Sequence, residues 1–333
     1  MQLTAPASVS RLLLALLLLI GSEVLAWNNP TGRPVVEWVL LLPGYLALSA
    51  LLLDFMVRYR VRDLFGALIL TGIYSLSAAL VLNPSATLND LPRTLMTRVM
   101  GAHALLAAEM LGFFLVLTRG QTRSRRYLLI GAIIVGLAWG IWVKNWPPDE
   151  GFGAVDLPVM LAYCAGSLAL IALLLYGLTA RPLPALADES APMPQDALRL
   201  GRQEWLMVAV ILVASAGLRL VRGEIPPGGL FVAGLLVLCW AILWFRGRKK
   251  GATLLDGCFP PQPIAFSRFL LIASLFLALA VFGYNLPAIQ VGTITPYTFI
   301  GLGFTAYGLA WLPTVSLVLG IQGYLRQLAT QQQ

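Results

Sequence analysis

Charged residues are scarce in this chain, making up only 11% of its 333 residues. A soluble globular domain carries about 25% charged residues. Hydrophobic residues, in contrast, reach 59%. This balance excludes a soluble enzyme, a disordered regulator and a disulfide-stapled secreted domain, and it is typical of a protein whose surroundings are lipid.

Histidine and cysteine are also rare. The one histidine, His103, excludes sites that need several, such as a bis-histidine haem site or an HExxH metalloprotease. Cys164, Cys239 and Cys258 are odd in number and lack metal-ligand spacing, so we expect neither a disulfide framework nor a zinc site. The G-x-S-x-G and GxxxxGK[ST] motifs are missing too. The sequence therefore disfavours an enzyme, predicts no metal site and identifies no cofactor.

Long apolar runs, by comparison, are abundant. A helix needs about 20 mostly apolar residues to span the hydrocarbon core of a membrane. Ten runs qualify as candidates, at residues 12–27, 35–57, 64–82, 99–117, 127–143, 157–177, 205–221, 229–245, 267–285 and 297–321. The longest gap, 178–204, is too short for a soluble domain. We expect residues 1–333 to form a single transmembrane domain, an all-α polytopic bundle of about ten transmembrane helices.

The basic residues are distributed unevenly between the gaps. With a cytoplasmic N-terminus, 17 of the 23 Lys and Arg residues fall in cytoplasmic segments and 6 fall outside. Cytoplasmic loops are enriched in Lys and Arg, so both termini and the 178–204 loop are predicted to be cytoplasmic. We expect a multi-pass protein of a bacterial-type inner membrane. The net charge of +8 then reflects topology and contact with the lipid bilayer rather than nucleic acid; other membrane subunits are an open alternative as partners.

The first span has a second interpretation. Arg11, the apolar run that follows it and the small residues near Ala26 resemble a signal peptide. Cleavage after Ala26 would leave nine spans without changing the orientation of the rest. We favour an uncleaved first helix.

The candidate functional residues centre on the fourth span, 99–117. Glu109 lies at its middle, where a carboxyl group must be neutral, paired or next to water. On an α-helix Arg98 shares a face with Glu109, whereas His103 lies about 120° away from it. Arg219 is a further basic candidate to pair with Glu109. A stripe of small residues, Ala104, Ala108 and Gly112, is expected to contact another helix.

Prolines within spans indicate a second candidate region. Pro313 interrupts the long run 297–321 and is followed by Thr314 and Ser316. Because proline removes a backbone donor, a carbonyl inside the membrane must find another partner. Interrupted helices of this kind surround the binding region in many transporters. Pro43 and Gly44 predict a second kink in the span 35–57.

Three functions follow from this pattern. The first is a carrier or permease component for an ion or small solute, with Glu109 as the titrating residue. The second is a non-catalytic anchoring subunit of a larger membrane complex, in which Glu109 only joins two helices. The third is an intramembrane enzyme that acts on a lipid. A water-accessible cavity reaching the membrane-centred acid would favour the first, and a polar cavity open sideways to lipid the third.

Overall fold

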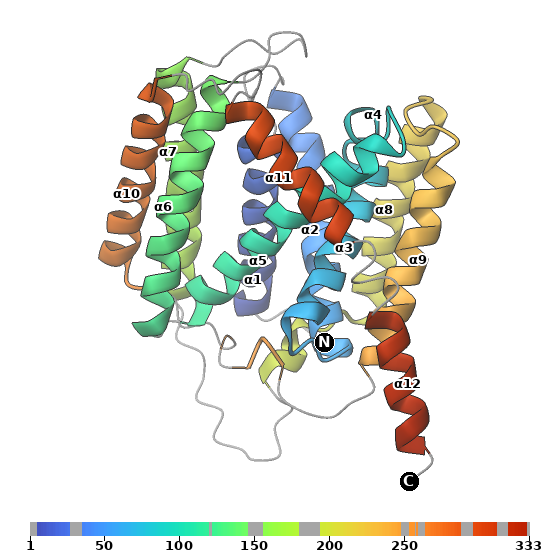
Figure 1. Cartoon of the computed structure of the whole chain (residues 1–333). Coiled ribbons are helices and arrows are strands. Elements are labelled where there is room, and N and C mark those ends of the chain that lie inside the picture. The colour runs from blue at the N-terminus through green and yellow to red at the C-terminus, as the bar shows by residue number, and fades with distance from the viewer. Residues whose placement is uncertain are drawn as a thin grey trace.

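A computed structural model describes residues 5–26, 35–119, 122–145, 156–179, 194–247, 253–256, 258, 264–287, 296–311 and 319–331. Within these ranges the regular secondary structure is helical, as the sequence predicts (Figure 1). Nine of the described helices are long and apolar enough to cross a membrane. The described chain is therefore all-helical, and its nine long apolar helices are consistent with a multi-pass membrane protein.

The helices follow one another through short connections. In chain order they are α1 (Ala5–Leu19), η1 (Ile20–Leu25), α2 (Val35–Arg58), α3 (Leu64–Val81), α4 (Pro84–Thr87), η3 (Leu95–His103), α5 (Ala104–Arg119), α6 (Thr122–Lys144), α7 (Leu157–Thr179), η5 (Pro194–Leu198), α8 (Arg202–Val221), α9 (Gly229–Arg246), α10 (Phe266–Asn285), α11 (Pro296–Trp311) and α12 (Leu319–Gln331). The segments η1 and η3 are π-helical, and η5 is a 3₁₀ turn.

The helices form a centre and two flanks (Figure 1). Helices α1, α2 and α5 lie in the middle, with α11 crossing the upper half of the view obliquely. Helices α6, α7 and α10 pack together on one side, and α3, α8 and α9 on the other. Helix α1 begins and α12 ends at the same end of the molecule, called the lower end below after its place in Figure 1.

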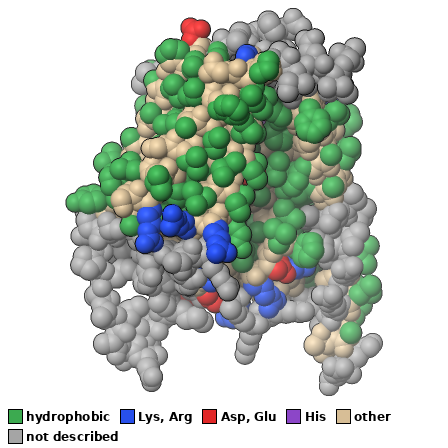
Figure 2. All heavy atoms as spheres, turned by 60° about the vertical axis from the view of Figure 1, so that its left-hand side comes forward, with side chains coloured by type: hydrophobic (Ala, Val, Ile, Leu, Met, Phe, Trp, Pro, Cys, Tyr) green, Lys and Arg blue, Asp and Glu red, His purple; other side chains and the backbone are tan. Residues whose placement is uncertain are grey.

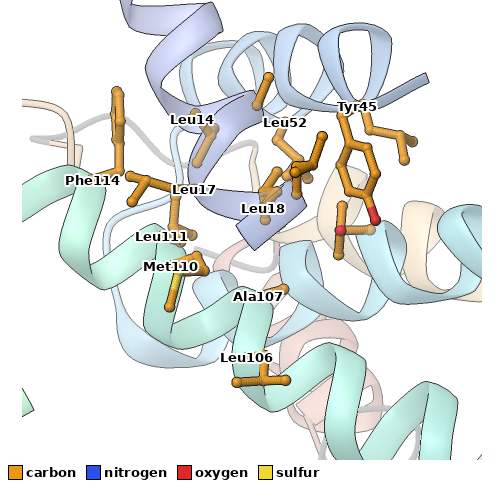
Figure 3. Close-up of a cluster of buried hydrophobic side chains, with 14 of the residues drawn as sticks. Leu14, Leu17, Leu18, Tyr45, Leu52, Leu106, Ala107, Met110, Leu111 and Phe114 are labelled. Carbon is orange, nitrogen blue, oxygen red and sulfur yellow. The ribbon is translucent and has the colours of Figure 1, made fainter. Parts of the chain in front are cut away.

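Apolar packing holds the centre together. Figure 3 shows Leu14, Leu17 and Leu18 of α1 next to Met110 and Leu111 of α5. Most of α1, α2 and α3 is buried, whereas almost none of α8 is. Large hydrophobic side chains also cover the outside, and Figure 2 shows Lys and Arg side chains gathered below this apolar belt. An apolar exterior with an apolar core is what a lipid solvent requires.

Charged groups join three helices near the lower end. Arg11 of α1 pairs with Glu204 of α8 at 2.8 Å. Asp54 of α2 is fully buried, pairs with Arg58 one turn later at 2.8 Å, and accepts the backbone N–H of Leu200 at 2.9 Å. The spacing of Asp54 and Arg58, four residues apart on α2, places the two side chains on one face of the helix. We call these four charged side chains the lower clamp.

The predicted run 297–321 is described only in part. Helix α11 covers its first part up to Trp311 and α12 begins at Leu319, whereas Pro313 lies outside the described residues. Within the predicted 178–204 loop, α7 continues to Thr179, the 3₁₀ turn η5 covers Pro194–Leu198 and α8 begins at Arg202. At the predicted kink, α2 is helical on both sides of Pro43.

Candidate functional site

A buried carboxyl group lies where η1, α2 and the end of α3 meet. Glu23 in η1 is only 1% exposed. Its Oε1 accepts hydrogen bonds from the Tyr45 hydroxyl at 2.6 Å and from Asn83 Nδ2 at 2.7 Å. A charge taken out of water is costly unless it is paired or hydrogen-bonded, so these two donors stabilise the carboxylate.

Ser22, the residue before Glu23, contacts two further polar side chains, those of Tyr74 and His103. The hydroxyls of Ser22 and Tyr74 are hydrogen-bonded at 2.8 Å, and His103 Nδ1 lies 3.4 Å from Ser22 Oγ. We call Ser22, Glu23, Tyr45, Tyr74, Asn83 and His103 the buried polar cluster. Its hydrogen bonds form two sets, one around Glu23 and one around Ser22, and the two sets meet because Ser22 and Glu23 are neighbours in the chain.

His103 also lines a partly open cavity of about 350 Å³, called the upper cavity here. The cavity lies between η1, η3, α6 and α11, and its lining residues are Ala26, Arg93, Thr94, Thr97, Arg98, Ala102, His103, Trp142, Thr298, Gly301, Leu302, Phe304 and Thr305. The buried polar cluster therefore meets the cavity at His103. From His103 the cluster continues to Ser22, the neighbour of Glu23 in the chain.

The charges around the upper cavity are predominantly positive. Arg93 and Arg98 line it, and its described lining contains no Asp or Glu. The positive charge of Arg93 is partly offset by Asp90, which pairs with it at 2.7 Å where both side chains are exposed. Arg98 Nη1 instead donates to the carbonyl oxygen of Ala86 at 2.7 Å, which fixes the guanidinium against the wall. An anion is favoured in this cavity over a cation.

The π-helical geometry of η3 places Arg98 and His103 on one side. In an α-helix, residues five apart point about 140° away from each other. A π-helix closes its hydrogen bonds from residue i to i+5, so residues five apart lie above one another. Arg98 and His103 have this spacing within η3, and both face the upper cavity.

The structure brings together only some of the predicted site residues. Arg98 and His103 share the upper cavity, whereas Glu109, on α5, is half-buried and does not line it. Arg219 does not pair with Glu109, because it forms an ion pair with Glu224 at 2.7 Å beyond the end of α8. Thr314 and Ser316 lie outside the described residues.

Sequence reasoning did not select Glu23, which lies near the end of the first predicted span, 12–27. The hydrogen-bond partners of Glu23 come from α2 and from the connection after α3, so no pattern of nearby residues in the sequence predicts them. One signal was present: Ser22 and Glu23 are polar neighbours directly after an apolar run in a span that otherwise lacks polar groups.

Other features of the described chain offer less chemistry. No group of three or more His, Cys, Asp or Glu side chains that could hold a metal ion occurs among the described residues. The three cysteines are free and buried. A second cavity of about 100 Å³, between α1, α5, α6, α7 and α10, has an almost entirely apolar lining. The upper cavity and the buried polar cluster are thus the candidate site.

No protein-family model matches the chain, and neither the curated proteins nor the solved structures contain a match to it. The chemistry of the candidate site is therefore the basis for a function.

Proposed function

We propose that this protein is a carrier that couples the movement of a small solute across a membrane to the movement of a proton. The observation that carries the proposal is the contact between the upper cavity and the buried polar cluster at His103. A solute can enter the cavity while a proton passes along the cluster. Ionisable groups deep in a membrane protein often belong to such proton paths.

Glu23 is the proposed proton carrier. A proton from water in the upper cavity would bind one carboxylate oxygen and change the charge of the group from −1 to 0. The proton would leave from the same group when the site opens to the other side of the membrane. The Tyr45 hydroxyl and the Asn83 amide stabilise the charged form between these events, since both donate to Oε1.

The two ends of the molecule support alternating access. The upper cavity is partly open, and the lower clamp joins α1, α2 and α8 near the other end. A carrier that exposes one binding site to each side in turn needs one end open while the other is closed. This arrangement corresponds to a state open at the upper end.

We also propose ten crossings with both termini cytoplasmic, in a bacterial-type inner membrane. The nine long helices account for nine crossings, and α11 with α12 would provide the tenth. Two observations support an even number: α1 begins and α12 ends at the same end of the molecule (Figure 1), and 17 of 23 basic residues then fall on one side.

The cavity also bears on the two alternative functions. An anchoring subunit has no need of a polar cavity beside a buried acid. An enzyme acting on lipid would require catalytic groups at a headgroup-depth opening toward the bilayer, whereas Glu23 lies behind Ser22 and His103. The carrier accounts for both the cavity and the cluster.

The test compares two matched variants, Glu23→Gln and Glu109→Gln. Glutamine keeps the size and hydrogen bonding of glutamate but cannot titrate. The purified chain is reconstituted in liposomes that contain a pH-sensitive dye. A panel of small anions, cations and neutral solutes is then added outside. We expect at least one solute to acidify the interior, with Glu23→Gln losing this acidification and Glu109→Gln keeping most of it.

Two results would contradict the proposal. The carrier function fails if no solute moves protons in the wild-type liposomes while the protein is folded and inserted. The assignment of Glu23 fails if folded Glu23→Gln keeps normal acidification, and a loss confined to Glu109→Gln would return the proton-carrying role to Glu109.

A further inference from the structure

The wall of the upper cavity contains a buried hydroxyl group without a partner. Thr94 is 1% exposed, and its Oγ1 makes no hydrogen bond among the described residues. Thr94 also lines the cavity. Buried polar side-chain atoms in native proteins nearly always have a hydrogen-bond partner, so an exception requires an explanation. The hydroxyl itself is not exposed to the cavity, so an acceptor atom of a bound ligand would supply the missing partner once the Thr94 side chain turns toward it.

The positive charge of Arg98 indicates what kind of acceptor this is. Its guanidinium lines the same cavity, held in place by the carbonyl oxygen of Ala86 at 2.7 Å. A guanidinium presents N–H donors in a planar fork that matches the oxygens of a carboxylate or phosphate group. Arg98 and Thr94 both come from the segment at the start of η3, four residues apart in the sequence.

We propose that the upper cavity binds a small oxyanion, with its carboxylate or phosphate oxygens on Arg98 and Thr94. This inference rests on the proposed function, in which the bound anion is the transported solute. The positive charge of the lining would attract the anion, and a proton carried by the buried polar cluster would balance its charge during transport.

The size and walls of the cavity narrow the ligand to a small organic acid. A volume of about 350 Å³ exceeds what a bare inorganic ion occupies. Trp142 and Phe304 form one side of the cavity, with ring centroids 5.6 Å apart in an edge-to-face arrangement. These rings would contact the apolar body of the ligand while Arg98 and Thr94 hold its charged group.

Binding is measured on the purified full chain in detergent, separately from transport. The probes are benzoate, its neutral analogue benzamide, and inorganic phosphate, each followed by calorimetric titration and by the shift in thermal unfolding. A fourth arm uses nanodiscs with or without phosphatidylglycerol, because a lipid headgroup also carries a phosphate. We expect saturable binding of benzoate, with benzamide binding at least about tenfold more weakly.

Three variants test the two proposed donors. Arg98→Gln should weaken benzoate binding by about tenfold or more, because it removes the charge. Thr94→Val keeps the shape of the side chain and removes only the hydroxyl, so it should weaken benzoate binding less than Arg98→Gln does. The midpoint of thermal unfolding without ligand should stay unchanged or rise. Arg222→Gln removes an exposed arginine at the end of α8 that does not line the cavity, and it should bind as the wild type does.

The outcomes separate this inference from the carrier function. The oxyanion site is overturned if no probe saturates, if benzamide binds as well as benzoate, or if Arg98→Gln binds like the wild type. Binding seen only with phosphatidylglycerol would support an oxyanion site but overturn the free organic acid as its ligand. Anion binding without any proton movement in liposomes would overturn the carrier and leave the site intact. Proton movement with only a cationic or neutral solute would support the carrier and overturn the oxyanion as its transported solute.

Discussion

The two hydrogen bonds to Glu23 differ in kind from the others in the buried polar cluster. Tyr45 and Asn83 donate to a carboxylate oxygen, whereas Tyr74 bonds to the neutral hydroxyl of Ser22. Hydrogen bonds to charged groups contribute about 1.5–3 kcal/mol, and those between neutral groups about 0.5–1.5 kcal/mol. The two tyrosines are both fully buried, so they form a matched pair for testing this difference.

We predict that Tyr45→Phe lowers the free energy of unfolding by about 1.5–3 kcal/mol, because it removes a donor from a buried carboxylate. The matched change Tyr74→Phe should cost about 0.5–1.5 kcal/mol. Reversible unfolding of the purified variants in mixed micelles measures both. An equal or larger loss for Tyr74→Phe would mean that Glu23 is uncharged in the folded protein.

At the residue scale the sequence selected two residues that line the upper cavity, Arg98 and His103. Arg98 and His103 could be selected because a charged residue and the sole histidine are conspicuous in an apolar span. Their shared direction could not be predicted, since the 100° per residue of an α-helix separates them and only the wider π turn aligns them. Glu23 was missed because its partners lie 22 and 60 positions away along the chain.

At the scale of helices, backbone atoms of η3 and α11 touch without side chains between them. A Cβ atom on Gly101 would lie 2.5 Å from the carbonyl oxygen of Phe304, and one on Gly308 would overlap the carbonyl oxygen of Met96. The stripe Ala104, Ala108 and Gly112 was expected to make such a contact. Ala104 is fully buried, but no described atom lies within 4 Å of a Cβ built on Gly112, so that expectation was wrong at Gly112.

We predict that Gly308→Ala destabilises the protein by about 1–3 kcal/mol, because the added methyl group forces η3 and α11 apart. Gly303→Ala, on the same helix, is the control. No described atom lies within 4 Å of its Cβ, so this change should be neutral or stabilising by up to about 1 kcal/mol. Thermal unfolding of both variants measures the difference. Equal midpoints would show that the two helices do not cross this closely.

Hydropathy predicts where helices lie better than how they are built. It placed nine spans within a few residues of the observed helices, because the length of an apolar run follows from the thickness of the bilayer. It carries no information on hydrogen-bond register, so the π-helical η1 and η3 were not foreseen. Of the run 297–321, the structure describes α11 up to Trp311 and α12 from Leu319, so the expected interruption at Pro313 lies outside the described residues.

At the scale of the whole molecule, the basic residues and the helix order make the same prediction. We expect a membrane-impermeant maleimide to label Arg222→Cys from outside intact cells, and to label Arg125→Cys and Leu328→Cys only after permeabilisation. All three positions are exposed, and the three native cysteines are buried. Labelling of Leu328→Cys from outside, with the other two as expected, would give an odd number of crossings and place the C-terminus outside.

The lower clamp holds the helices of the bundle together at one end only. Its ion pairs and the Leu200–Asp54 hydrogen bond fix α1, α2 and α8 to one another near one end, whereas η1, which continues α1, reaches the upper cavity at the other. Helix α1 is thus held at Arg11, near its start, and can tilt about that point. The helical stretch from Arg11 to Ser22 is about 16 Å long, so a tilt of about 5° moves Ser22 by about 1.5 Å. That displacement separates a hydrogen-bonded pair from a broken one, so a slight rotation at the held end is enough to make or break the contacts between Ser22 and His103.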